Sequence, residues 1–136
     1  MKSKHIRTYM ECAEAFAKCS ESTRLHVGCI IVKDNNIISS GYNALPKHID
    51  GSLEDEFGKT RPEVRHAEKN ALMHLTKSNQ SSVGATLFCT HLPCKFCAID
   101  IVDSGIKEVW FKHIYRLMDG LAYFHDNNII VTQYHD

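Results

Sequence analysis

The chain has 136 residues, of which 43% are apolar and 24% are charged, values close to those of ordinary globular proteins. This composition excludes a disordered chain, a collagen-like fibre and a coiled-coil rod, and the length predicts a single domain over residues 1–136. Sixteen basic residues balance sixteen acidic ones, so we expect no general attraction to nucleic acid polymers or anionic membranes.

The N-terminal part of the chain has the pattern of a helix followed by a hairpin. Apolar residues recur at steps of three and four over residues 4–19, which predicts a helix with one buried face. A nearly continuous apolar run at 27–32 predicts a buried strand, and residues 33–36 predict a turn into a return strand at 37–42. Residues 43–62 contain two prolines and two glycines and are predicted to form a loop, whose length is typical of functional loops.

The rest of the chain alternates helices and strands. The predicted helices cover residues 64–77, 94–104 and 117–125, and the predicted strands cover residues 86–89, 108–111 and 129–132. Gly105 directly follows one of these helices, in a position where glycine commonly ends a helix. Strands that alternate with helices predict an α/β sandwich with a partly parallel sheet.

Two short motifs, each expected at the start of a helix, carry the candidate chemistry. Cys94 and Cys97 are three residues apart, so both sulfur atoms lie on one helix face and can reach one ion. The free N–H groups of a helix N-terminus favour the thiolate form that binds metal. His66 begins another helix and is the natural third ligand of a zinc ion. Three protein ligands leave a fourth position for water, as in catalytic zinc sites.

Glu68 follows His66 by two residues, an offset that places it on a different face of the helix. It is therefore a poor ligand for the same ion, but it can reach a water molecule at the metal from the side. Zinc lowers the pKa of its water to about 7, and a nearby carboxylate can take the proton and pass it on. Glu68 is the candidate proton shuttle.

Two other interpretations of the cysteine pair remain open. Cys94 and Cys97 could instead be a redox pair, which lies at the start of a helix after a strand and needs no paired histidine. Alternatively, Cys89 or His91 would complete a closed, structural zinc site, and the chain would be a zinc-stabilised interaction module without catalytic activity.

The other cysteines favour a reducing compartment, with the cytoplasm (or the host cytoplasm, for a viral protein) as the expected location. Cys12 and Cys19 fall on the first helix, and Cys29 and Cys89 fall in strands. We expect all four to be buried as small apolar side chains.

Four stretches of the chain together resemble the zinc-dependent cytidine deaminase superfamily, and more narrowly its dCMP deaminases of bacterial and phage type. They read TRLHVG at 23–28, ISSGYN at 38–43, HAEKNA at 66–71 and THLPCKFCA at 90–98. The combination His-x-Glu with Pro-Cys-x-x-Cys is the signature of zinc nucleobase deaminases. Tyrosine in Gly-Tyr-Asn narrows the resemblance, because the related tRNA adenosine deaminases typically carry tryptophan there.

The resemblance implies a three-layer α/β/α sandwich with a five-stranded mixed sheet, and hydrolysis of dCMP to dUMP and ammonia. It implies that His66, Cys94 and Cys97 bind one zinc ion and that Glu68 shuttles protons. The implied substrate contacts are Ser22 and Arg24 with the phosphate, Asn43 with the deoxyribose, the Ala67 backbone with the base, and Tyr115 near the nucleotide. Residues 43–62 contain no cysteine, so we expect no second zinc.

Members of this family are often hexamers that dCTP activates and dTTP inhibits, with Mg²⁺ on the bound triphosphate. By position, the resemblance implies an effector site at Lys47, Asp50, His74 and Lys77. Other members of the superfamily deaminate free cytidine, guanine or tRNA adenosine, and these activities remain alternatives. The balanced charge disfavours tRNA, because proteins that bind it usually have a basic face.

Overall fold

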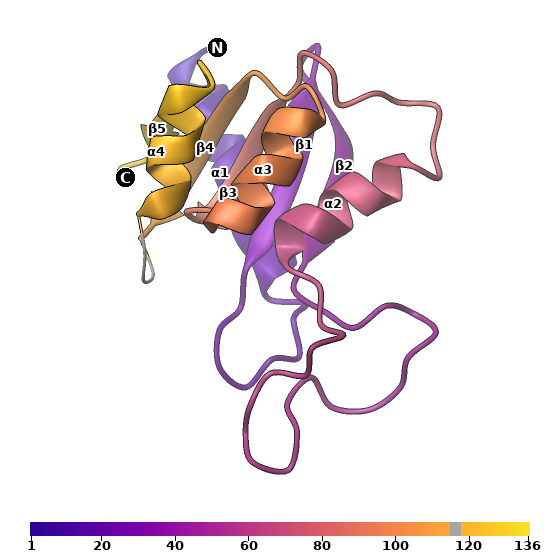
Figure 1. Cartoon of the computed structure of the whole chain (residues 1–136). Helices are drawn as coiled ribbons and strands as arrows, with labels where there is room; N and C mark the ends of the chain where they lie inside the picture. The colour runs from indigo at the N-terminus through magenta and orange to yellow at the C-terminus, as the bar shows by residue number, and fades with distance from the viewer. Residues whose placement is uncertain (115–117) are drawn as a thin grey trace.

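The computed structural model describes residues 1–114 and 118–136, which form a five-stranded sheet with helices on both faces (Figure 1). The strands are β1 (Gly28–Lys33), β2 (Asn36–Tyr42), β3 (Thr86–His91), β4 (Glu108–His113) and β5 (Ile130–Gln133). Their order across the sheet is β2-β1-β3-β4-β5. β1 is antiparallel to both of its neighbours, whereas β3, β4 and β5 run parallel to one another. The prediction of a five-stranded mixed sheet is confirmed.

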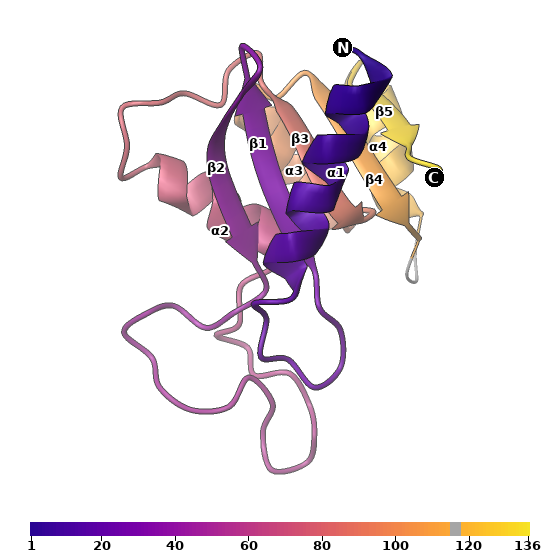
Figure 2. The same cartoon turned by 180° about the vertical axis from the view of Figure 1, so that it is seen from behind.

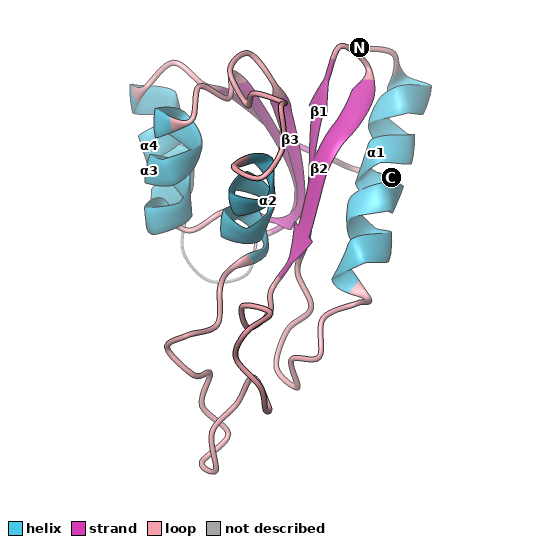
Figure 3. Cartoon of the chain, turned by 90° about the vertical axis from the view of Figure 1, so that its right-hand side faces the viewer, coloured by secondary structure: helices cyan, strands magenta, loops and turns pink. Residues whose placement is uncertain are grey.

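The helices divide unequally between the two faces of the sheet. Of the helices in residues 1–114 and 118–136, only α1 (Ser3–Ala17) covers one face, as the view from behind shows (Figure 2). α2 (Ala67–Leu75), α3 (Lys95–Asp103) and α4 (Asp119–Asp126) cover the other face, so the side view shows three layers (Figure 3). None of the helices formed by the described residues is long and apolar enough to cross a membrane.

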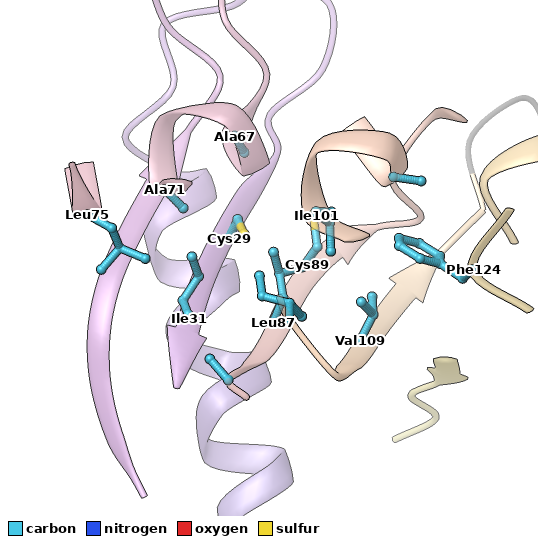
Figure 4. Close-up of a cluster of buried hydrophobic side chains, with 13 residues drawn as sticks. Cys29, Ile31, Ala67, Ala71, Leu75, Leu87, Cys89, Ile101, Val109 and Phe124 are labelled. Carbon is cyan, nitrogen blue, oxygen red and sulfur yellow. The ribbon is translucent and has the colours of Figure 1, made fainter. Parts of the chain in front are cut away.

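The core has two parts because the central strands are buried on both faces. Alternate residues of β1 point to opposite sides, so Cys29 and Ile31 face α2 and α3 (Figure 4), while Ile30 faces α1. This burial explains why the sequence of β1 is continuously apolar rather than alternating. The cluster under α1 consists of Tyr9, Met10, Ala13, Ile30, Val32 and Phe88.

Gly41 lets α2 approach the sheet closely. A Cβ atom at this position would lie 2.5 Å from the carbonyl oxygen of Ala67 and 2.6 Å from the backbone nitrogen of Ala71. Both atoms belong to the backbone of α2, so no side-chain rotation can relieve the overlap. Glycine in β2 therefore sets the position of the helix that carries Glu68.

Two predictions from the sequence need correction. α2 begins at Ala67 rather than at residue 64, because Arg65 pairs with Ala44 in an isolated antiparallel bridge that keeps the preceding backbone extended. The expectation of burial is wrong for Cys19, which is exposed because α1 ends at Ala17, and Cys12 is only half-buried. Cys29 and Cys89 are buried as expected.

Candidate metal and catalytic site

His66 and Cys94 occupy equivalent places, since each is the residue at which a helix begins. Both have extended backbone angles, with ψ of 156° at His66 and 166° at Cys94. Their carbonyl oxygens accept the first helical hydrogen bonds, from Asn70 and Ala98. Neither side chain caps its own helix, so the imidazole and the thiol are available to a ligand.

Cys97 lies three residues after Cys94, a spacing that brings the side chains at the start and in the first turn of a helix together. His66 Nδ1 lies 3.3 Å from the sulfur of Cys97 and 3.7 Å from that of Cys94. One ligand atom from each of the three residues lies within 4.8 Å of the others. A tetrahedral zinc ion with ordinary bond lengths separates nitrogen and sulfur ligands by about 3.6 Å. The donor set and the spacing therefore fit zinc.

The electrostatics of the cluster favour a thiolate. Hydrogen bonds with Cys97 and with His66 lower the pKa of the Cys94 thiol to about 3. The hydrogen bond with Cys94 in turn raises the pKa of the His66 imidazole, against the opposing effect of burial. The cluster thus stabilises negative charge at Cys94, which is the form in which cysteine binds metal.

Glu68 lies at the floor of the site, on the side of α2 that faces the sheet. The residue is only 4% exposed, and burial raises the pKa of its carboxyl group. The Cys89 thiol donates a hydrogen bond to Oε1 at 3.1 Å. Glu68 is absent from the group of clustered metal ligands, as its offset from His66 predicted.

A closed zinc site with a fourth protein ligand finds no support in the described part of the chain. Among residues 1–114 and 118–136, no fourth His, Cys, Asp or Glu joins the cluster. Cys89 bonds to Glu68 instead, and His91 lies 5.2 Å from His113, measured between ring centroids. Burial, followed by the charge of His113, lowers the pKa of His91 to about 4, so that imidazole is neutral at physiological pH.

A cavity of about 480 Å³ opens beside the cluster, a volume typical of small-molecule sites. Ser22, Arg24, Asn43 and Ala67, four residues implied to contact substrate, all line it. It is also lined by three residues of the predicted metal and proton-transfer site, namely His66, Glu68 and Cys94. The structure therefore places the predicted substrate contacts next to the metal ligands.

Asn43 shapes the cavity wall as well as lining it. Its Oδ1 accepts the N–H of Val27 at 2.9 Å, and its Nδ2 donates to the carbonyl oxygen of Leu25 at 2.8 Å. An amide group retains one N–H and one lone pair after these two bonds. Asn43 can thus fix the connection between α1 and β1 and still bind a hydroxyl group.

Ser22 and Arg24 differ in what they can offer a ligand. The Ser22 hydroxyl donates to Glu54 Oε2 at 3.0 Å and accepts the N–H groups of Arg24 and Leu25, at 3.1 Å and 3.3 Å. These bonds use its one proton and both lone pairs, so it has none left for a substrate. Arg24 is exposed, and within the described residues its guanidinium forms no ion pair.

Several residues of the cavity wall were missed by the sequence analysis. They are Leu25, Val27, Thr60, Val64 and Leu92, whereas His91, which also lines the cavity, was considered only as a structural zinc ligand. Most of them lie next to a predicted site residue or motif, and this proximity was the only signal for them. Thr60 and the buried Glu54 had no such signal, because they lie in the long loop, where no hydrophobic period indicates which side chains turn inward.

Among the described residues, those of the implied effector site are not brought into the cavity. Tyr115 lies outside the described residues. The implied effector site is exposed and does not line this cavity. Its four residues are Lys47, Asp50, His74 and Lys77. His74 bonds through Nδ1 to the carbonyl oxygen of Ser40 at 2.6 Å.

Comparisons with known proteins agree on one family. Residues 3–113 match the model of the cytidine and deoxycytidylate deaminase zinc-binding region. The chain is 34% identical over 120 residues to the deoxycytidylate deaminase of Saccharomyces cerevisiae, covering 80% of this chain but only 38% of that protein. The deoxycytidylate deaminase of Mycobacterium phage D29 is 32% identical over 115 residues, and 88% of its length is covered.

A solved structure resembles the whole described fold. The dCMP deaminase of the cyanophage S-TIM5, in complex with dCMP and dUMP, aligns with a TM-score of 0.96 at 38% identity. The alignment covers 98% of this chain and 99% of that one. The chain thus spans nearly the full length of this phage structure and less than two-fifths of the yeast relative.

Proposed function

The chain belongs to the cytidine and deoxycytidylate deaminase family, and we propose that it hydrolyses dCMP to dUMP and ammonia. The observation that carries the proposal is the juxtaposition of the His66, Cys94 and Cys97 cluster, the buried Glu68 and one cavity. The near full-length match to a dCMP deaminase structure that contains dCMP and dUMP supports this substrate.

In the proposed reaction, His66, Cys94 and Cys97 hold zinc, which supplies Lewis acidity and makes a water molecule nucleophilic at neutral pH. Glu68 accepts one proton of the attacking water and transfers it to N3 of the cytosine ring. It then takes the second proton, from the hydroxyl group formed at C4, and delivers it to the departing amine, which leaves as ammonia as the C4 carbonyl forms. The attack occurs at C4 of the base. Burial keeps the carboxyl group of Glu68 out of bulk solvent, so its protons pass to the substrate.

The cavity wall suggests how the rest of the nucleotide is held. Asn43, which keeps one free N–H and one lone pair, is assigned to the deoxyribose hydroxyl. Arg24 is assigned to the 5′-phosphate, because a guanidinium matches a phosphate with paired hydrogen bonds. The backbone of Ala67 borders the cavity and is assigned to the base. The Ser22 hydroxyl is assigned no direct contact, and Tyr115 stays a prediction.

A substrate panel tests the proposal. Purified zinc-loaded protein should release ammonia from dCMP with a higher kcat/KM than from deoxycytidine, cytidine or guanine, and should not deaminate adenosine in tRNA. Higher activity on free cytidine, guanine or tRNA would transfer the assignment to another member of the superfamily. No ammonia from any substrate, in protein that contains one zinc per chain, would favour an interaction module without catalytic activity.

Regulation, assembly and location extend the proposal. The four exposed residues of the effector site would bind dCTP as activator or dTTP as inhibitor, with Mg²⁺ on the triphosphate, in a hexamer. They are Lys47, Asp50, His74 and Lys77. Sedimentation of the protein with and without each triphosphate, together with dCMP turnover in the same buffers, tests both ideas. A soluble nucleotide as substrate also favours the cytoplasm.

A further inference from the structure

Glu54 is a buried carboxylate for which the proposed chemistry has no use. It lies in the long connection between β2 and α2, and the residue is only 8% exposed. Oε2 accepts the hydroxyl proton of Ser22 at 3.0 Å, and Oε1 accepts the N–H of Thr23 at 3.1 Å. Taking a carboxylate out of water is costly unless specific hydrogen bonds compensate, so Glu54 is stable in this position only while it keeps these contacts. The contacts therefore hold the connection between β2 and α2 against the connection between α1 and β1.

The Ser22 hydroxyl that bonds to Glu54 also bonds to the backbone of Arg24. A serine hydroxyl can donate one hydrogen bond, and Ser22 donates it to Glu54. The ionised carboxylate of Glu54 can only accept hydrogen bonds, so the direction of this bond is fixed. The two lone pairs of the hydroxyl are thereby directed toward the N–H groups of Arg24 and Leu25. The carboxylate therefore fixes the backbone of Arg24 through a single intervening oxygen atom.

Glu54 also joins two parts of the cavity wall that are far apart in the sequence. Its backbone pairs with Thr60 in an isolated antiparallel bridge, while its side chain bonds to the segment that contains Arg24. Arg24 and Thr60 both line the cavity that Glu68 borders. Figure 1 shows the two connections, after α1 and after β2, extending together beyond the end of the sheet.

We propose that Glu54 is a positioning residue for phosphate recognition, which holds Arg24 through Ser22 and Thr60 through the backbone bridge at one wall of the cavity. This inference rests on the proposed dCMP deaminase function. For the effect of removing the Glu54 charge on phosphate binding, the inference and simple electrostatics predict opposite signs. Removing a negative charge near a phosphate should strengthen phosphate binding by Coulomb's law, whereas losing a positioning residue should weaken it.

The test is a double-mutant cycle on the full-length, zinc-loaded protein with dCMP as substrate. Glu54→Gln keeps the shape of the side chain, but its amide group can no longer accept from both partners as the carboxylate does. We expect Glu54→Gln to raise the KM for dCMP about tenfold with little change in kcat, as for loss of one charge-assisted hydrogen bond. In an Arg24→Ala background, which itself has a raised KM, Glu54→Gln should have almost no further effect.

Glu56→Gln is the matched control, since Glu56 is an exposed glutamate of the same loop, and its KM should not change. Ser22→Ala, which leaves the carboxylate in place, should reproduce the effect of Glu54→Gln and serves if that variant does not fold. Additive effects of the Glu54 and Arg24 changes, an unchanged KM in Arg24→Ala, or tighter dCMP binding in Glu54→Gln would each overturn the inference. Failure of the wild-type protein to deaminate dCMP would instead overturn the proposed function on which the inference depends.

Discussion

Replacing Gly41 with alanine should separate α2 from the sheet and disable the site without touching any of its residues. The new Cβ would lie 2.5 Å from the oxygen of Ala67 and 2.6 Å from the nitrogen of Ala71, whereas carbon contacts need about 3.5 Å. Because both neighbours are helix backbone, α2 must withdraw by roughly 1 Å. Overpacking of this kind costs about 1–3 kcal/mol, and the rigid neighbours favour the upper end. His66 and Glu68 would move with the helix.

The expected result is a melting temperature about 10 °C lower in thermal denaturation. A displacement of about 1 Å in catalytic groups also predicts a loss in kcat/KM for dCMP of about a hundredfold. Gly84→Ala is the control, because Gly84 has a positive φ of 77° and no atom within 4 Å of a new Cβ. It should lose about 1 kcal/mol of stability through backbone strain and keep full activity. Equal stability and activity in the two variants would refute the reasoning about close packing.

Three further predictions concern pH, metal and stability. Burial alone would raise the pKa of Glu54, but the hydrogen bonds that its carboxylate accepts outweigh burial and lower this pKa. The ionised carboxylate therefore stabilises the folded protein above the unfolded-state pKa, and this stabilisation is lost as the pH falls through the folded-state pKa. In an acid titration of unfolding, the stability difference between Glu54→Gln and wild type should shrink as the pH falls below the ordinary glutamate pKa of about 4.3, and a constant difference would contradict this. Chelation of zinc should make the half-buried Cys94 reactive toward iodoacetamide, detected by peptide mass spectrometry, while the exposed Cys19 reacts with or without metal. Equal labelling of Cys94 and Cys19 in the zinc-loaded protein would count against the metal site. Asn43→Ala leaves two backbone groups without partners and should lower the free energy of unfolding in urea by about 2 kcal/mol; a loss below about 0.5 kcal/mol would show that water replaces the amide.

The sheet and its helices were predictable because each element has a strong local pattern. The continuous apolar run of β1 indicated burial on both faces, and the core confirms it. The start of α2 was misplaced because the pairing of Arg65 with Ala44, which keeps that segment extended, depends on a contact distant in sequence. Local propensity cannot show such a pairing.

The site was only partly predictable, for a related reason. The spacing of Cys94 and Cys97 fixes their geometry within one helix, and His66 reaches them because two helices begin at the same end of the sheet. Ser22 was expected to contact phosphate, but its hydroxyl is used by the buried Glu54 and the neighbouring backbone. Only the fold of the long loop reveals that Glu54 reaches this position.

The most direct measurement of the central claim is dUMP formation from dCMP by wild type and by Glu68→Gln, with bound zinc measured in the same samples. Wild type should convert dCMP to dUMP, and Glu68→Gln should contain about one zinc per chain yet show turnover reduced by at least a thousandfold, because the buried proton shuttle is lost. Full activity in Glu68→Gln, or no dUMP from zinc-loaded wild type, would contradict the account.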